Sequence, residues 1–199
     1  MENVIKLENI CKSYDNKAVL ENFNCEIKKN KVNFIMGPSG RGKSTLLNIL
    51  MRIESCDKGT ITGMKNLDVA AVFQEDRLCE NLSVSSNIRM VHNNLKGQVK
   101  NDFIEEVKVL LDKTGLGDIA ANIVKTLSGG MKRRISILRC VLADGDILFF
   151  DEALKGLDKQ SEEQFMEVIL PYLKDKTVVW VTHDETQKKY FDDVHIIRM

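Results

Sequence analysis

The sequence of 199 residues is poor in the residue types that build metal centres, disulfide frameworks and membrane spans. It has three histidines, and its five cysteines lie far apart without a C-x-x-C pair, at positions 11, 25, 56, 79 and 140. This spacing argues against a cysteine metal site and against a disulfide framework, so we expect reduced thiols. No apolar run approaches the length of a membrane span, and the N-terminus has no apolar signal-peptide core. We therefore expect that this chain alone does not cross a bilayer.

The sequence also has no excess of either charge. Lys and Arg together number 29, as do Asp and Glu, which gives a formal net charge of zero. Without a basic excess we expect no nucleic-acid partner. An apolar content of 43% in a chain of this length predicts one compact domain, which subdomains can divide.

One glycine-rich stretch fits G-x-x-x-x-G-K-[ST], the pattern of a phosphate-binding P-loop. It runs Gly37-Pro38-Ser39-Gly40-Arg41-Gly42-Lys43-Ser44-Thr45. Backbone N–H groups can converge on a triphosphate only where glycine permits the required backbone angles. In this arrangement Lys43 reaches the β- and γ-phosphates, Ser44 places its hydroxyl on Mg²⁺, and a helix N-terminus faces the anion. The alternative is an ordinary glycine-rich turn.

The residues around this loop favour the P-loop interpretation. The run 32–36 is mostly apolar and predicts a buried strand that ends at the first glycine. Beyond the loop, Leu46, Ile49, Leu50 and Ile53 recur at the spacing of one helical face. A strand, a loop and a helix in this order are the context that a P-loop requires.

Polar residues end two further apolar strands. The run 146–150 leads to Asp151 and Glu152, and the run 177–182 leads to His183. In a parallel sheet the carboxyl ends of strands are where ligands bind. The simpler alternatives are a helix cap for one acid and a structural role for the lone histidine. His195 alternates with apolar neighbours and is assigned no role.

The remaining patterns alternate between strands and helices. Strands are predicted over 4–10, 18–27 and 69–73, a short hairpin arm over 58–63, and a last strand over 194–197. Helical patterns run from residue 82 to about 114, from 131 to 142 after a second glycine-rich turn, and from 165 to 173. The alternation predicts an α/β fold with a mainly parallel sheet and helices on both faces. Tyr14 ends the first strand, either as a half-buried sheet residue or as a platform for a purine ring.

Taken in order, these motifs resemble the ATP-binding cassette (ABC) ATPase subunits of membrane transporters, over essentially the whole chain. The resemblance rests on the P-loop, Gln74, the Leu127-Ser128-Gly129-Gly130 turn, the Asp151-Glu152 strand end, Leu157-Asp158 and His183. It implies a P-loop NTPase core with a mainly parallel sheet, an antiparallel β arm and a helical subdomain insert. It also implies one cassette over 1–199, with its core at 1–77 and 136–199 and the helical subdomain at about 78–135.

The resemblance implies a role for each matching residue. Tyr14 matches the aromatic residue that stacks on adenine. Residues 37–45 match the loop that holds the phosphates. Ser128, Gly129 and Gly130 match the signature motif, which binds ATP held by another subunit. Gln74 matches a glutamine that contacts Mg²⁺ and the attacking water. Asp151 matches an aspartate that holds Mg²⁺ through water. Glu152 matches the catalytic glutamate that polarises the water, and His183 the histidine that links the γ-phosphate to Glu152 and Asp158.

The resemblance also implies partners and a place in the cell. A complete site needs two cassettes head to tail with ATP and Mg²⁺ between them, either two copies of this chain or one copy and a different cassette. Such subunits bind membrane permease subunits from the cytoplasmic face, and importers can add an extracytoplasmic solute-binding protein. Removal of the γ-phosphate would then open the dimer.

Some residues depart from the family pattern. Met131 stands where the signature usually ends in glutamine, and Ala153-Leu154-Lys155-Gly156 replaces a segment closer to Pro-Thr-Ser-Ala. The short arm between Lys43 and Gln74, with the run 74–78, resembles importers of the nitrate, sulfonate and taurine type. The main hypothesis is a Mg²⁺-dependent ATPase that drives transport, with import favoured over export. The alternatives are a non-transport member of the superfamily and a cassette that binds ATP and regulates a partner without turnover.

Overall fold

The computed structural model describes residues 3–92 and 94–199, which form two compact units. The first unit comprises residues 1–71, 145–152 and 174–199, and the second comprises 72–144 and 153–173. None of the helices in the described ranges is long and apolar enough to span a membrane. The predicted boundaries, with the core at 1–77 and 136–199 and the helical subdomain at about 78–135, remain a prediction.

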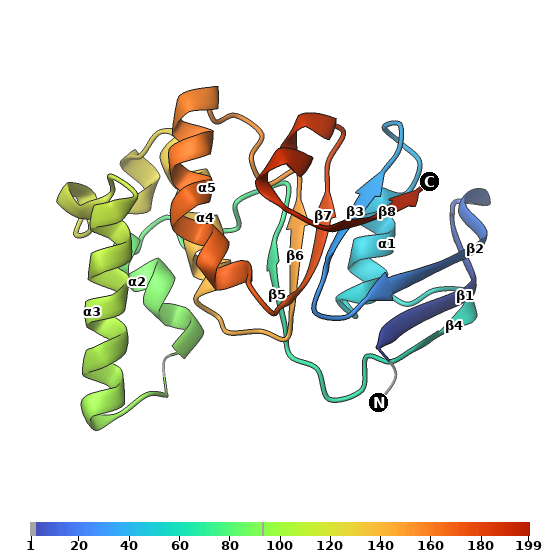
Figure 1. Cartoon of the computed structure of the whole chain (residues 1–199), viewed down its shortest axis with the longest axis horizontal. Coiled ribbons are helices and arrows are strands. Elements are labelled where there is room, and N and C mark those ends of the chain that lie inside the picture. Colours follow the sequence, from blue (N-terminus) through green and yellow to red (C-terminus); the bar gives the residue numbers. More distant parts are fainter. Residues whose placement is uncertain (1–2, 93) are drawn as a thin grey trace. The chain divides into compact units, whose positions relative to one another are not determined.

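Within the described residues, eight strands make two sheets (Figure 1). The smaller sheet has the order β2-β1-β4, and the larger has the order β5-β6-β7-β3-β8. The strands are β1 (Val4–Tyr14), β2 (Lys17–Lys28), β3 (Val32–Met36), β4 (Lys58–Thr62), β5 (Val69–Val72), β6 (Ile147–Asp151), β7 (Thr177–Val181) and β8 (Val194–Arg198). β1 pairs antiparallel with β2 and β4, whereas β3 pairs parallel with β7 and β8, and β6 pairs parallel with β7. The antiparallel arm and the mainly parallel sheet are therefore both as predicted.

Five α-helices and four short 3₁₀ segments complete the described part of the chain. The α-helices are α1 (Lys43–Leu50), α2 (Val84–Arg89), α3 (Gly97–Lys113), α4 (Gly129–Val141) and α5 (Lys159–Leu173). The 3₁₀ segments are Met90–His92, Gly117–Ile119, Val124–Thr126 and Glu185–Tyr190. In the second unit α2 contacts α3 and α4, and α4 contacts α5. In the chain α2, α3 and α4 lie between β5 and β6, and α5 follows β6.

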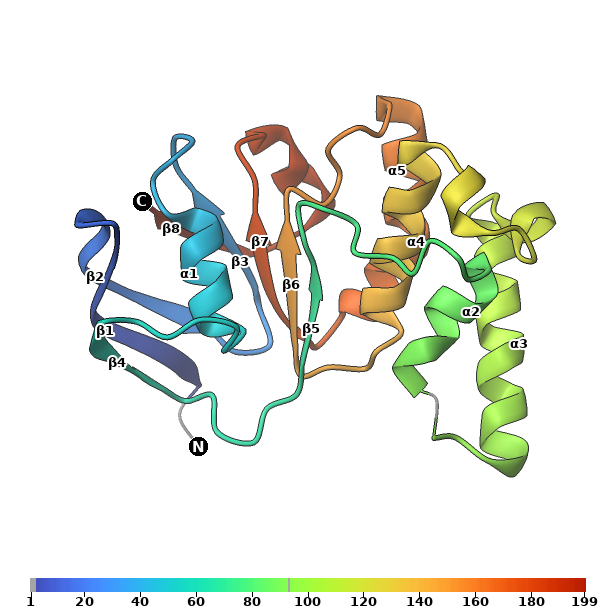
Figure 2. The ribbon, with the colours of Figure 1, turned by 180° about the vertical axis from the view of Figure 1, so that it is seen from behind.

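The core of the first unit lies between its two sheets and α1. Apolar side chains of α1, such as Leu46 and Leu50, belong to the same buried cluster as Ile5 of β1 and Val179 of β7. Figure 2 shows α1 beside β3, in the position that the P-loop pattern requires. This packing fixes the start of α1 against the carboxyl end of β3, because neither end of the helix can move without exposing the cluster.

The other face of the larger sheet carries an aromatic cluster. The rings of Phe150 and Trp180 stack with centroids 4.6 Å apart, and Phe34 and Phe191 lie within 6.3 Å of the Trp180 ring. The Trp180 indole N–H donates to the Gln187 side-chain oxygen at 2.9 Å, so its polar atom is satisfied inside the core. Both faces of the central strands are thus buried, as expected for a parallel sheet.

Three sequence predictions need correction. α1 ends at Leu50, so Ile53 is 55% exposed and does not extend the apolar helical face. The predicted hairpin arm is instead strand β4, whose partner β1 is distant in the sequence. The helical pattern over 82–114 is interrupted, because α2 ends at Arg89 and α3 begins only at Gly97.

Candidate active site

The P-loop joins the carboxyl end of β3 to the N-terminus of α1. Gly40 and Gly42 have φ angles of +79° and +88°, in the left-handed region that favours glycine. A Cβ atom on Gly42 would also lie 2.9 Å from a side-chain carbon of Leu20. These two glycines therefore have a conformational cause and Gly42 also a steric one, and the loop joins a buried strand to a helix N-terminus, which is the context that the P-loop interpretation requires.

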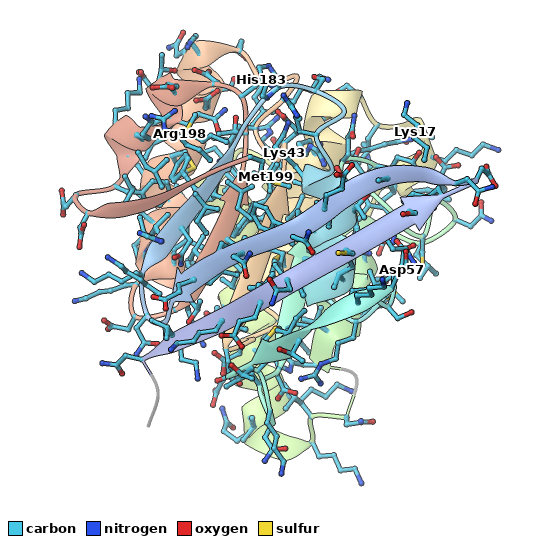
Figure 3. All side chains as sticks on the ribbon, turned by 90° about the vertical axis from the view of Figure 1, so that its right-hand side faces the viewer. Lys17, Lys43, Asp57, His183, Arg198 and Met199 are labelled. Atoms are coloured by element: carbon cyan, nitrogen blue, oxygen red, sulfur yellow. The ribbon has the colours of Figure 1, made fainter. Side chains whose placement is uncertain are left out.

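The Lys43 ammonium lies inside the curve of this loop. It donates to the backbone oxygens of Gly37 and Pro38, each at 2.8 Å. An ammonium carries three donors and these two bonds use two of them. Met199, labelled with Lys43 in Figure 3, lies at the start of the loop: its N–H donates to the Met36 oxygen at 2.9 Å, and a Cβ atom on Gly37 would lie 2.8 Å from its backbone oxygen. The contact of Met199 with the start of the loop was not predicted, since no sequence pattern joins residues so far apart.

Asp151 and Glu152 lie at the carboxyl end of β6. Asp151 is only 7% exposed, and it pairs with Val181 of the neighbouring parallel strand. Glu152 has a φ of +50°, and its N–H donates to the Val181 oxygen at 2.9 Å. A non-glycine residue in this region is held by its surroundings at a cost of about 1–3 kcal/mol. Such strain clusters at functional sites, and no local sequence pattern indicates it at Glu152.

His183 contacts Glu152 directly. Its Nδ1 lies 2.8 Å from the Glu152 Oε1, and with an ionised carboxylate the imidazole N–H donates. The Glu152 side chain is 14% exposed and that of His183 is 64% exposed, so the pair faces solvent through the imidazole. β3, β6 and β7 are parallel in one sheet, so these two residues and the P-loop follow strands that end at the same edge. The predicted shared edge is thus present.

Tyr14 ends β1 and is 41% exposed. Its hydroxyl donates to Glu54 Oε2 at 2.6 Å, and this hydrogen bond raises the Tyr14 pKa. A smaller opposing effect comes from the hydroxyl of Thr45, which lies in α1. The tyrosine is therefore neither a buried sheet residue nor a freely rotating one.

The signature turn opens α4 in the second unit. Ser128 is the N-cap of this helix, and its hydroxyl accepts from the Met131 N–H at 3.4 Å. A Cβ atom on Gly129 would meet nothing within 4 Å, and one on Gly130 would meet only Leu157 and Gly156 at ordinary contact distance. The turn thus presents an open glycine backbone at a helix N-terminus, an arrangement suited to a phosphate.

Gln74 lies in the loop after β5, and Arg133 of α4 holds this loop. The guanidinium donates to the Phe73 oxygen at 2.6 Å and the Gln74 oxygen at 3.0 Å, and it pairs with Asp76 at 3.1 Å. The Arg133 side chain is 7% exposed. Sequence reasoning missed this residue, although it lies only three positions after Gly130 of the signature motif. It ties the backbone of the glutamine loop to the helix that the signature turn opens.

Asp158 directly precedes α5 in the second unit. Its carboxylate accepts from the Ser161 N–H at 2.9 Å, and hydrogen bonds from Ser161 lower its pKa. In the preceding segment, which departs from the family pattern, Ala153 and Leu154 are buried. The Leu157 N–H closes a turn on the Leu154 oxygen at 3.2 Å. The altered residues therefore form a packed turn that leads into the Asp158 cap.

The predicted site residues are divided between the two units. The first unit holds Tyr14, residues 37–45, Asp151, Glu152 and His183, and the second holds Gln74, residues 128–130 and Asp158. Within the first unit the structure joins Glu152 to His183 and encloses Lys43 in its loop. His195 contacts the Glu26 oxygen through its Nε2 at 3.1 Å, which agrees with a structural role.

Comparisons with known proteins agree with this arrangement. A family model described as ABC transporter matches residues 20–155. The phosphonates import ATP-binding protein PhnC of Fusobacterium nucleatum subsp. nucleatum is 31% identical over 218 residues, which cover 98% of this chain and 88% of that protein. The taurine import ATP-binding protein TauB of Ruegeria pomeroyi is 33% identical over 192 residues, which cover 90% of this chain and 71% of that protein.

A solved structure has the same fold. The dimeric post-hydrolysis state of the ATP-binding cassette MJ0796, bound to ADP and Pi, matches with a TM-score of 0.82 and 25% identity, over 97% of this chain and 94% of that one. The predicted fold class, a P-loop NTPase core with an antiparallel arm and a helical insert, is confirmed. The chain belongs to the ABC transporter family, as one of its ATP-binding cassette ATPase subunits.

Proposed function

We propose that this chain binds ATP at its P-loop, hydrolyses it at Glu152, and uses the energy to drive solute import through a separate membrane permease. The observation that carries the proposal is the 2.8 Å contact between Glu152 and His183, at the same edge of the sheet as the Lys43 loop. A carboxylate oriented by an imidazole beside a phosphate-binding loop is the arrangement that activates water against a phosphoryl group.

The chemistry is a displacement at the γ-phosphorus. Glu152 accepts a proton from the attacking water, a bond forms from the water oxygen to the γ-phosphorus, and the bond to the β,γ-bridging oxygen breaks. Lys43 and the N-terminus of α1 stabilise the charge on the phosphate oxygens. His183 holds the carboxylate in place through its Nδ1, and when both ring nitrogens carry a proton the imidazolium also donates to the γ-phosphate through Nε2. Positioning and electrostatics supply most of the rate enhancement in this class of reaction.

The donor set at this edge fits Mg²⁺. Among the described residues no group of three or more His, Cys, Asp or Glu side chains could hold a metal by itself. Mg²⁺ at nucleotide sites is held instead by one or two protein oxygens together with phosphates and waters. The Ser44 hydroxyl at the start of α1 and the buried Asp151 carboxylate supply such oxygens, and Gln74 is the third proposed ligand. When bound, the ion would neutralise charge on the phosphates.

A second cassette completes the proposed site. Ser128, Gly129 and Gly130 present an open backbone at the start of α4, which suits the phosphates of an ATP held by another subunit. The neighbour MJ0796 is a dimeric cassette, which supports a head-to-tail pair. The partner is a second copy of this chain or a different cassette. The permease would hold the pair at the cytoplasmic face of the membrane, with Gln74 in the loop nearest to it.

Import is favoured because the relatives PhnC and TauB are both named as import proteins. Their named solutes differ, phosphonates in one and taurine in the other, although the identities to this chain are almost equal. We therefore propose that the permease and any solute-binding protein, rather than this chain, select the solute. The narrower resemblance to nitrate, sulfonate and taurine importers stays within this proposal.

Nucleotide binding tests the proposal directly. The change Lys43→Ala should weaken ATP binding at least ~30-fold, because it removes a charge that contacts the phosphates. The matched control is Lys28→Ala, at an exposed lysine that ends β2, far along the strand from Lys17, which pairs with Tyr14 (Figure 3). Equal ATP affinity in both variants, measured by isothermal titration calorimetry, would reject the phosphate site.

A further inference from the structure

A cluster of polar side chains holds the hydroxyl end of Tyr14. The hydroxyl donates to Glu54 Oε2 at 2.6 Å, at the short end of the range for O–H···O bonds. The acceptor is an ionised carboxylate, and such charge-assisted bonds are about twice as strong as neutral ones. Tyr14 as a residue is 41% exposed, so its hydroxyl is tethered while the residue stays accessible to solvent.

Glu54 is itself held in place by Lys12. The ammonium lies 3.2 Å from Glu54 Oε1 and 3.3 Å from Asp57, and it donates to the Ser55 oxygen at 2.9 Å. The side chains of Lys12 and Glu54 are only 12% and 24% exposed, so solvent screens their interaction incompletely. The hydrogen bond from Tyr14 is the largest cause that lowers the pKa of Glu54. The carboxylate is therefore ionised at neutral pH and cannot turn away without breaking several contacts.

Asp57 closes the cluster on the backbone of β1. Its carboxylate accepts from the Ser13 N–H at 2.7 Å, directly before Tyr14. Figure 3 shows Asp57 at the side of the β1–β2 turn, where β4 begins. Glu54 and Asp57 both follow the P-loop helix α1 in the chain, so the cluster ties the end of β1 to the segment that leaves this helix. We call Lys12, Glu54 and Asp57 the Tyr14 bracket.

We propose that Glu54 is a positioning residue, which holds the exposed Tyr14 ring as a stacking platform for the purine base of the bound nucleotide. The inference rests on the proposed function and deepens it, because it assigns residues outside the phosphate loop to recognition of the base. A ring whose hydroxyl is already fixed loses less rotational freedom when a base stacks on it. The bracket pre-organises base binding, and its three residues lie outside the phosphate loop 37–45.

The proposal predicts that loss of Glu54 affects the base and not the triphosphate. Two probes separate these parts: ATP, and inorganic tripolyphosphate, which lacks the base and the ribose. Glu54→Ala should weaken ATP binding ~5-fold, the equivalent of one lost hydrogen bond, and leave tripolyphosphate binding unchanged. Glu54→Gln keeps an oxygen acceptor and should recover part of the affinity. The control Glu21→Gln removes one exposed carboxylate from β2 and should change neither affinity.

Variants of the tyrosine complete the experiment, and they keep the test valid if Glu54→Ala folds poorly. Tyr14→Phe retains the ring and removes only the hydroxyl, so its ATP affinity should match that of Glu54→Ala. The double variant with Glu54→Ala should be no weaker than either single change, since both break the same bond. Tyr14→Ala removes the platform itself and should weaken ATP binding roughly 10-fold or more.

Different failures have different signatures in this experiment. Wild-type ATP affinity in both Glu54→Ala and Tyr14→Phe would overturn the positioning role. An equal loss of ATP and tripolyphosphate affinity would also overturn it. The bracket would then stabilise the folded protein as a whole and would not act on base binding in particular. Wild-type protein that binds neither probe would reject the proposed function itself. Binding of both probes with no effect of Tyr14→Ala would reject the stacking platform while leaving the phosphate site intact.

Discussion

Arg133 offers a quantitative test of how the glutamine loop is held. Its guanidinium bonds the backbone oxygens of Phe73 and Gln74 and pairs with Asp76, and the side chain is 7% exposed. Hydrogen bonds from a charged group each contribute about 1.5–3 kcal/mol, but they are not additive and water can reach Asp76. We expect Arg133→Met to lower the free energy of unfolding by ~3 kcal/mol, measured by urea denaturation followed by circular dichroism.

The neighbouring residue Lys132 is a matched control. It lies in the same helix and pairs with Glu80 at 3.1 Å. The Glu80 side chain is 58% exposed. Exposed pairs contribute at most about 1 kcal/mol, so Lys132→Met should lower stability by less than that. Equal losses in the two variants would refute the claim that the buried guanidinium contacts hold the loop.

The loss of stability caused by Arg133→Met should depend on pH. Burial raises the pKa of Asp76, and the positive charge of Arg133 is the largest opposing effect. Without Arg133 the pKa of Asp76 in the folded protein rises further above its unfolded value of about 3.9. The folded variant then binds a proton more tightly, which stabilises it as the pH falls towards that unfolded value. The loss caused by Arg133→Met should therefore be smaller at about pH 4.5 than at about pH 7.5, and the opposite trend would contradict this assignment.

Two further predictions concern the glycine loop and the thiols. Gly42→Ala should lower the free energy of unfolding by at least ~1 kcal/mol, because φ is +88° and the new Cβ would meet Leu20 at 2.9 Å; an unchanged urea midpoint would contradict this. Burial raises the pKa of the Cys140 thiol to about 12, whereas Cys79 is exposed, so iodoacetamide should label Cys79 in the folded protein and Cys140 only in denaturant. Rapid labelling of Cys140 in the folded protein, read by peptide mass spectrometry, would reject its burial.

The parts of the site that sequence predicted are those with a local pattern. The P-loop glycines, the carboxylates after β6 and His183 after β7 follow from short motifs at strand ends, and parallel strands bring such ends to one edge. The motifs that identify these residues consist of neighbours along the chain, so they can be read from a single sequence. The prediction that Ile53 extends the apolar face of α1 was wrong. The apolar spacing continues in the sequence beyond Leu50, the residue at which α1 ends.

The contacts that sequence did not predict join distant residues. Tyr14 and Glu54 are 40 positions apart, and Arg133 and Phe73 are 60 positions apart. Polar side chains of this kind carry no periodic signal, and their pairing depends on how the strands and helices pack. The positive φ of Glu152 is likewise imposed by the Val181 backbone and not by its own residue type. Tertiary packing, rather than local preference, determines these features.

The central claim is that Glu152 activates water against ATP in a paired cassette. Its most direct test is Mg²⁺-dependent ATP hydrolysis by the purified chain as a function of protein concentration, beside the Glu152→Gln variant. For a pair of identical copies, activity per molecule should rise with concentration, and the variant should bind ATP without turnover because its amide cannot accept the proton. Hydrolysis by Glu152→Gln at the wild-type rate would contradict the account.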